Sequence, residues 1–140
     1  MKFSLLFLVF VVGCASQSYL INNQNYSLGD LKKTLVSLIG EPRQMSENQR
    51  TIYSRYFSRK ADSKFDPEKA PERLYAAITI LGDRRPYEVQ VEVFYEIKDG
   101  GAYINQGIDD IETNKLGRGI RTRLNQGRED RNIIDDFRAF

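Results

Sequence analysis

The stretch Tyr87–Lys98, YEVQVEVFYEIK, alternates apolar and polar side chains with a period of two. The positions that share its apolar side are Tyr87, Val89, Val91, Val93, Tyr95 and Ile97. The other side carries Glu, Gln and Lys, interrupted by Phe94. This pattern is typical of a half-buried strand in an antiparallel sheet. The stretch therefore predicts a sheet with one face against a core.

Two further stretches toward the N-terminus also predict strands. Arg73–Leu81, RLYAAITIL, is apolar on both faces, as expected of a central strand, and the loop GDRRP joins it to Tyr87 as a hairpin. Arg50–Ser58, RTIYSRYFS, is rich in aromatic and β-branched residues. The charged segment between these two stretches contains two prolines and predicts a surface loop. We expect a three-stranded antiparallel sheet.

An N-terminal helix is predicted in YSLGDLKKTLVSLIGEP, which begins at Tyr26. Ser27 and Asp30 have the spacing of a capping box. Leucines recur at helical spacing through this stretch, at positions 28, 31, 35 and 38. Gly40 suits the left-handed position after a helix, and Pro42 prevents its continuation.

The C-terminal third predicts helix after the turn KDGG. An apolar stripe runs through Ile108, Ile111, Leu116, Ile120 and Leu124. Gly117 and Gly119 weaken this helix, and Gly127 is expected to end it before a second helix that contains Phe137. The expected fold class is α+β: an N-terminal helix, a three-stranded antiparallel sheet, and one or two C-terminal helices packed on one sheet face.

The chain begins with the pattern of a secretory signal. Lys2 is followed by an apolar run from Phe3 to Val12, which is about half the length of a bilayer-spanning helix. The sequence VVGC, ending at Cys14, resembles the bacterial lipobox. That resemblance implies cleavage before Cys14 and attachment of diacylglycerol to its thiol. The alternative is an ordinary signal peptide with a cysteine near its end.

Lipidation at Cys14 implies a division of the chain. Residues 1–13 would be the signal peptide, residues 14–25 the lipidated cysteine and a polar tether, and residues 26–140 a single α+β domain. Ala15 and Ser16 follow the cysteine without an acidic residue, which resembles sorting to the outer rather than the inner membrane. The expected location is the bacterial cell envelope, with the domain facing the periplasm.

Composition excludes several classes of function. The chain has no histidine and no tryptophan, and its one cysteine is the expected lipid site. We therefore expect neither catalysis by a histidine dyad or a cysteine nucleophile nor a zinc site. Catalysis by carboxylates is not excluded. Lys and Arg total 21 against 19 Asp and Glu, which argues against nucleic-acid binding. No metal and no cofactor beyond the covalent lipid are expected.

The helix, its stop and the aromatic stretch after it resemble the small lipoproteins of the β-barrel assembly machinery, the BamE type. The residues that carry the likeness are Leu31, Leu35, Ile39, Gly40, Pro42, Tyr53 and Tyr56. The resemblance spans about residues 26–57 and implies an accessory role in outer-membrane protein assembly. The chain departs from that family by its longer loop before Arg73 and by its additional C-terminal helix.

Two groups of residues are candidates for binding. Arg84, Arg85 and Tyr87 lie around the expected hairpin tip, where arginine and tyrosine are typical of protein-binding sites. The second group is an arginine cluster, Arg118, Arg121, Arg123 and Arg128, which suits anionic headgroups, glycan phosphates or an acidic partner. The alternatives are an ordinary exposed turn and a solvated helix face.

We therefore expect a non-catalytic lipoprotein, held on its membrane through Cys14, that binds an envelope protein as an accessory in envelope assembly. The alternative is a module that binds anionic lipid or glycan through the arginine-rich helix.

Overall fold

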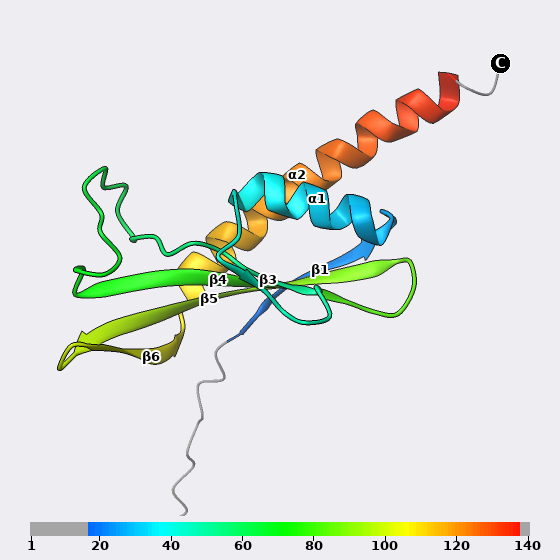
Figure 1. The fold of residues 1–140 in the computed structure, drawn as a ribbon. Coiled ribbons are helices and arrows are strands. Elements are labelled where there is room, and N and C mark those ends of the chain that lie inside the picture. Colours follow the sequence, from blue (N-terminus) through cyan, green and yellow to red (C-terminus); the bar gives the residue numbers. More distant parts are fainter. Residues whose placement is uncertain (1–16, 138–140) are drawn as a thin grey trace, which may run out of the picture.

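The computed structural model describes the backbone of residues 17–137 and the side chains of residues 17–127. Within this part, six strands form one antiparallel sheet in the order β1-β5-β4-β3-β2, with β6 also paired to β5. The strands are β1 (Tyr19–Gln24), β2 (Gln44–Met45), β3 (Thr51–Tyr53), β4 (Glu72–Leu81), β5 (Tyr87–Asp99) and β6 (Ala102–Ile108). Helices α1 (Leu28–Ile39) and α2 (Asp110–Phe137) both lie on one face of this sheet (Figure 1).

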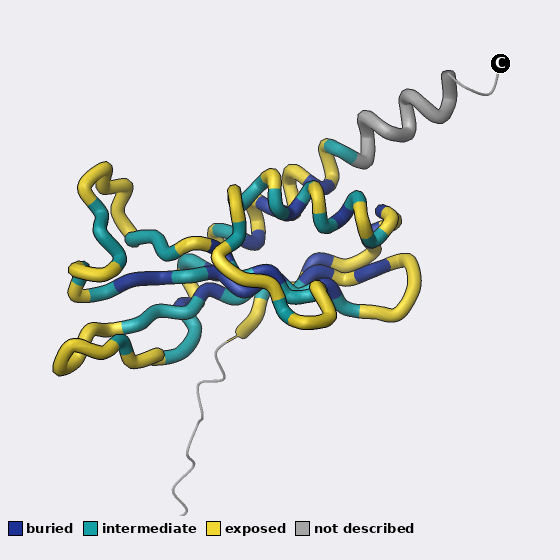
Figure 2. The backbone as a smooth tube through the Cα atoms, in the orientation of Figure 1, coloured by how far each residue is buried: buried dark blue, intermediate teal, exposed yellow. Residues whose placement is uncertain are grey.

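The core lies between this helix-covered face and the two helices. Alternate residues of the central strands point into it, because β4 and β5 pair in register with Ile78 opposite Val91 and Ile80 opposite Val89. The buried residues of this cluster include Leu31, Leu35, Ile52, Ile78, Ile80, Val89, Val91, Ile120 and Leu124. Figure 2 shows burial concentrated along these strands and the facing sides of the helices. The predicted burial of alternate residues in β5 is confirmed through Val93.

The predicted fold of an N-terminal helix and a three-stranded sheet is wrong in both respects. The first element described is strand β1, so helix α1 comes second, and the sheet has six strands. Residues 19–24, expected to belong to a polar tether, form the edge strand β1 beside β5. Ile21 of β1 is buried in the core, whereas the neighbouring Leu20 is 46% exposed. Because this stretch is rich in asparagine and glutamine, its sequence pattern did not predict a strand with a buried side.

Helix α1 begins and ends at the residues that the sequence indicated. Ser27 is the N-cap, and its hydroxyl accepts a hydrogen bond of 3.1 Å from the backbone N–H of Asp30. Gly40 follows the helix with a φ of +79°, which favours glycine. The hydroxyl of Tyr26 donates to the carbonyl of Leu124 at 2.7 Å, which ties the start of α1 to α2.

The predicted strand Arg50–Ser58 is much shorter in the structure. Only Thr51–Tyr53 forms β3, followed by one isolated bridge between Phe57 and Leu74. The pairing breaks at Ser54, whose hydroxyl accepts the hydrogen bond from the backbone N–H of Ala76 at 2.8 Å. The backbone N–H of Ser54 still donates to the carbonyl of Ala76 at 2.9 Å, so one bond of this pair is made by the backbone and the other by a side chain, and the regular ladder ends here.

The region after the KDGG turn differs from the prediction at both ends. Ala102–Ile108 forms strand β6, not helix, and α2 then continues through Gly127 as one helix. Two of its glycines, Gly117 and Gly127, lie where another side chain packs closely against the helix. A Cβ at Gly117 would lie 2.3 Å from the ring of Tyr19, and one at Gly127 would lie 3.0 Å from the hydroxyl of Tyr26.

The N-terminus of α2 fills a gap along one edge of β5. Strand β1 pairs with β5 up to Val91, and β6 pairs with it from Phe94 onward. Between them, the carbonyl of Val93 accepts a bond of 2.7 Å from the backbone N–H of Asp109. The N–H of Val93 donates to the hydroxyl of Thr113 at 2.8 Å. The helix thus satisfies the backbone groups that neither strand reaches.

Candidate interaction surface

The sheet face opposite the helices carries a concentration of aromatic and arginine side chains. We call this group the sheet-face cluster, and its members are Arg43, Tyr53, Tyr56, Arg73, Tyr75, Phe94 and Tyr103. On β4, Arg73 and Tyr75 alternate with the core residues Leu74 and Ala76. Since side chains alternate along a strand, the cluster lies on the face that α1 and α2 leave open (Figure 1).

Arg73 lies between two tyrosine rings within this cluster. Its guanidinium carbon is 3.8 Å from the ring centroid of Tyr56 and 3.5 Å from that of Tyr103. Its Nε donates to a carboxylate oxygen of Glu96 at 2.7 Å. Burial by itself lowers the pKa of Arg73. The hydrogen bond to Glu96 and the nearby acidic groups have a larger combined effect, so the pKa lies above its usual value. The result is a cation held in one orientation by two rings and a carboxylate.

The remaining rings of the cluster pack against one another. Tyr75 stacks on Phe94 with centroids 5.4 Å apart, and Tyr56 meets Tyr75 edge-on at 5.9 Å. The exposed Arg43 lies over both tyrosines, 4.5 Å from the centroid of Tyr56 and 5.3 Å from that of Tyr75. Burial, followed by the charge of Glu96, raises the pKa of the Tyr75 hydroxyl, which stays neutral at neutral pH. The rings therefore form a largely preformed surface.

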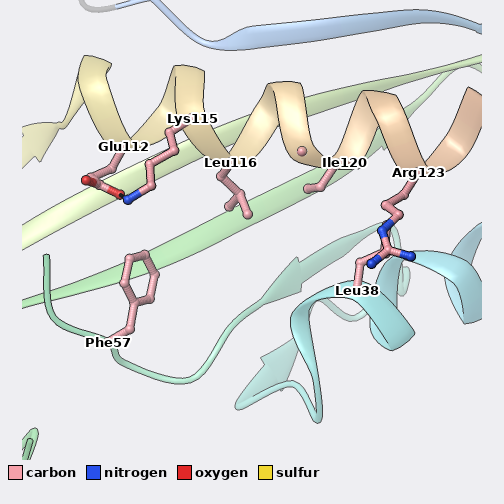
Figure 3. A pocket seen from close by; sticks show the side chains of 8 residues that line it. Leu38, Phe57, Glu112, Lys115, Leu116, Ile120 and Arg123 are labelled. Carbon is pink, nitrogen blue, oxygen red and sulfur yellow. Dashed lines mark hydrogen bonds and ion pairs between the residues drawn. The ribbon is translucent and has the colours of Figure 1, made fainter. Parts of the chain in front are cut away.

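A separate apolar groove lies on the helix side, between α1 and α2 (Figure 3). It has a volume of about 390 Å³, within the range of small-molecule pockets. Phe57 faces Leu116 of α2 across it, and Arg123 lies near Leu38 at its other end (Figure 3). Lys115 and Glu112 form an ion pair of 3.5 Å at its rim. The groove combines an apolar lining with charges of both signs.

The three residues predicted around the hairpin tip do not form one surface. Arg84 and Arg85 are exposed in the turn between β4 and β5. Tyr87 is only 8% exposed and belongs to the core cluster. Its position as the first residue of β5 faces the core, as its place in the alternating pattern indicated. The hairpin tip thus presents two arginines without the tyrosine.

The predicted arginine cluster is divided between different sides of α2. Arg118, Arg121 and Arg123 are all exposed, and the side chain of Arg128 lies outside the described residues. At 3.6 residues per turn, Arg123 points roughly 140° away from Arg118. Arg118 lines a hollow with Ile111, whereas Arg123 lines the groove. Arg118 and Arg121 are three residues apart and share one side of α2, so Arg123 is the one of these three that does not converge with the others on one anion.

Cys14, the predicted lipidation site, also lies outside the described residues, three positions before Gln17. The backbone N–H of Gln17 donates to the carboxylate of Asp110 at 3.2 Å. The first residue that the structure describes is therefore bonded to the first residue of α2.

The central residues of the sheet-face cluster were not predicted as functional. Phe94, which interrupts the polar side of Tyr87–Lys98, was the sequence signal that pointed to this face. Arg73 and Tyr103 come from strands that meet only through β5, so their proximity depends on the pairing of β6. That pairing could not be read from the short polar stretch that forms β6.

Comparisons with known proteins add no relatives. No protein-family model matches the chain, and neither a curated protein nor a solved structure was found that matches it. Neither helix within residues 17–137 has the length and apolarity of a membrane span. Among the described side chains, histidine, cysteine and carboxylate groups do not gather in threes as a metal site would need.

Proposed function

We propose that this protein is a non-catalytic lipoprotein of the bacterial cell envelope, anchored through Cys14, which binds a protein partner through the sheet-face cluster. The observation that carries the proposal is the preformed layer of tyrosine, phenylalanine and arginine on the sheet face that neither α1 nor α2 covers.

The chemistry of this layer favours a protein as the partner. Tyrosine and arginine are enriched among the residues that dominate binding energy at protein interfaces. The rings and Arg73 already contact one another, so binding would order few further side chains. Nearby carboxylates support binding rather than catalysis, because Glu96 pairs with Arg73 and Asp109 pairs with Arg59.

The accessory role in outer-membrane assembly is the more specific part of this proposal. Helix α1, the Gly40 stop and the aromatic strand β3 follow one another in the order on which the resemblance to the assembly lipoproteins rests, with the short strand β2 between the stop and β3. Strands β1 and β6 and the long helix α2 are departures from it. The partner that we propose is accordingly an envelope protein, on the outer membrane or in the periplasm.

Binding of anionic lipid or glycan through the arginine-rich helix is the competing function. It is supported by the exposure of Arg118, Arg121 and Arg123. It is weakened by the direction of Arg123, which points away from Arg118 and Arg121, since a cluster that recognises one phosphate needs its guanidinium groups on the same side.

Paired charge reversals distinguish the two functions. Arg43→Glu changes an exposed residue of the sheet-face cluster, and Arg121→Glu is the matched change on α2. Each variant is expressed as the full chain, cross-linked in intact cells, and its co-purifying proteins are identified by mass spectrometry. We expect Arg43→Glu to lower recovery of the partner about tenfold, equivalent to about 1.4 kcal/mol, and Arg121→Glu to leave it unchanged. The reverse result would support the arginine-rich helix.

A further inference from the structure

The expected lipid anchor lies close to one end of helix α2. Gln17 follows Cys14 by three residue steps, and this length of chain spans at most about 11 Å. Gln17 is bonded through its backbone N–H to Asp110, the first residue of α2. A lipid on Cys14 would therefore keep this end of the domain within a short distance of the bilayer surface.

The surface at this end of α2 includes the most exposed of the large hydrophobic residues that the structure describes. Ile111 is 76% exposed and follows Asp110 directly. Together with Asn114 and Arg118 these residues line a hollow of about 380 Å³. Ile111, Asn114 and Arg118 are three and four residues apart in turn, so they share one side of the helix. An apolar side chain and a guanidinium thus lie on the same surface.

We infer that Ile111, Asn114 and Arg118, which we call the α2 patch, contact the headgroup region of the bilayer to which Cys14 is attached. This inference rests on the lipidation that is part of the proposed function. Amphipathic surfaces lie at this level with apolar side chains toward the acyl chains, while arginine pairs with lipid phosphate. The short connection to Cys14 is what selects a membrane as the occupant of this patch.

The same contact orients the rest of the domain. Strand β1 runs from Tyr19, opposite Val91, to Gln24, opposite Tyr87, and so leads toward the β4–β5 turn. Five residue steps along a strand cover about 17 Å. The turn that contains Asp83 therefore lies at the end of β1 that is farther from the anchor, and we expect it to face away from the bilayer.

A single tryptophan introduced into the lipidated protein tests the inference, because the chain has none of its own. Ile111→Trp and Asn114→Trp place the reporter in the α2 patch, and Asp83→Trp is the matched exposed control in the β4–β5 turn. Each protein is reconstituted into phosphatidylethanolamine–phosphatidylglycerol vesicles, with and without bromine on the acyl chains. We expect the bromine to quench most of the fluorescence at positions 111 and 114 and little at position 83.

The two ways in which this account can fail have different readouts. A protein that floats with the vesicles but shows equal quenching at positions 83, 111 and 114 would overturn the α2 patch and leave the anchor in place. A protein whose Cys14 carries no lipid by mass spectrometry, and which does not float, would overturn both. Arg118→Glu in the Ile111→Trp background is expected to reduce quenching in these anionic vesicles. No change would remove Arg118 from the patch.

Discussion

Thr113 has a structural role that could not be predicted from its residue type. It lies in the first turns of α2 with no exposed surface, and its hydroxyl accepts the backbone N–H of Val93 at 2.8 Å. Threonine is a modest helix former, so its place here is explained by this bond and not by helix propensity.

Replacement of Thr113 tests this role. Thr113→Val keeps the shape of the side chain but leaves the buried N–H of Val93 without an acceptor. We expect a loss of about 1–3 kcal/mol in the free energy of unfolding, measured by urea denaturation. Thr122→Val is the control on the same helix, because Thr122 is exposed and its hydroxyl bonds only to the carbonyl of Arg118. Equal effects of the two changes would contradict the account.

Two glycines of α2 provide a second test at the scale of the residue. A Cβ at Gly117 meets the Tyr19 ring at 2.3 Å, whereas one at Gly119 meets no atom within 4 Å. Gly117→Ala is expected to destabilise the protein by about 1–3 kcal/mol despite the better helix propensity of alanine. Gly119→Ala is expected to stabilise it by up to about 1 kcal/mol. Thermal unfolding of both variants measures the difference, and stabilisation by Gly117→Ala would refute the close packing of β1 on α2.

Among the elements, strand β1 is the edge strand that pairs with β5, and the burial of its residues tests this placement. Ile21 is 2% exposed and Leu20 is 46% exposed, although the two are neighbours on one strand. We expect Ile21→Ala to cost about 2–5 kcal/mol of unfolding free energy, because it removes buried methyl groups. Leu20→Ala should change it by less than about 0.5 kcal/mol. If residues 19–24 were a tether, both changes would be silent.

The elements that were predictable from the sequence are those with a strong period or a strong cap. Tyr87–Lys98 alternates apolar and polar residues with one interruption, at Phe94, and Ser27 with Gly40 marks both ends of α1. Strands β1 and β6 escaped because they are short, polar and buried on few positions. The stability of such edge strands comes from pairing with β5, which is a long-range property.

The glycines of α2 also show that local sequence rules do not predict contacts between distant parts of the chain. Gly127 is a reasonable helix stop by local rules, yet it permits the approach of Tyr26 to the carbonyl of Leu124. Likewise, Arg118 and Arg123 are close in sequence but point to different sides of α2, because five residues correspond to about 140° of rotation. The contact between Arg73 and Tyr103, two members of the sheet-face cluster that were not predicted, depends on strand pairing in the same way.

At the scale of the whole molecule, the two faces of the sheet have different roles in this account. One face carries the helices and the core, and the other carries the sheet-face cluster with Arg73 at its centre. If Cys14 is lipidated and the α2 patch lies against the bilayer, as we propose, the β4–β5 turn extends away from the membrane. A partner protein would then reach the sheet-face cluster from beside the anchored domain.

The central claim is that the open sheet face binds a protein, and site-specific photo-cross-linking in living cells tests it most directly. A photoreactive residue replaces Asn105, which lies beside Tyr75. In the native protein the amide nitrogen of Asn105 is 3.1 Å from the hydroxyl of Tyr75. The same residue at the exposed Lys33 of α1 reports on the helix side. We predict a cross-linked protein of defined mass from position 105 that is lost with Arg43→Glu, and none from position 33. Cross-links from position 33 alone would contradict the claim.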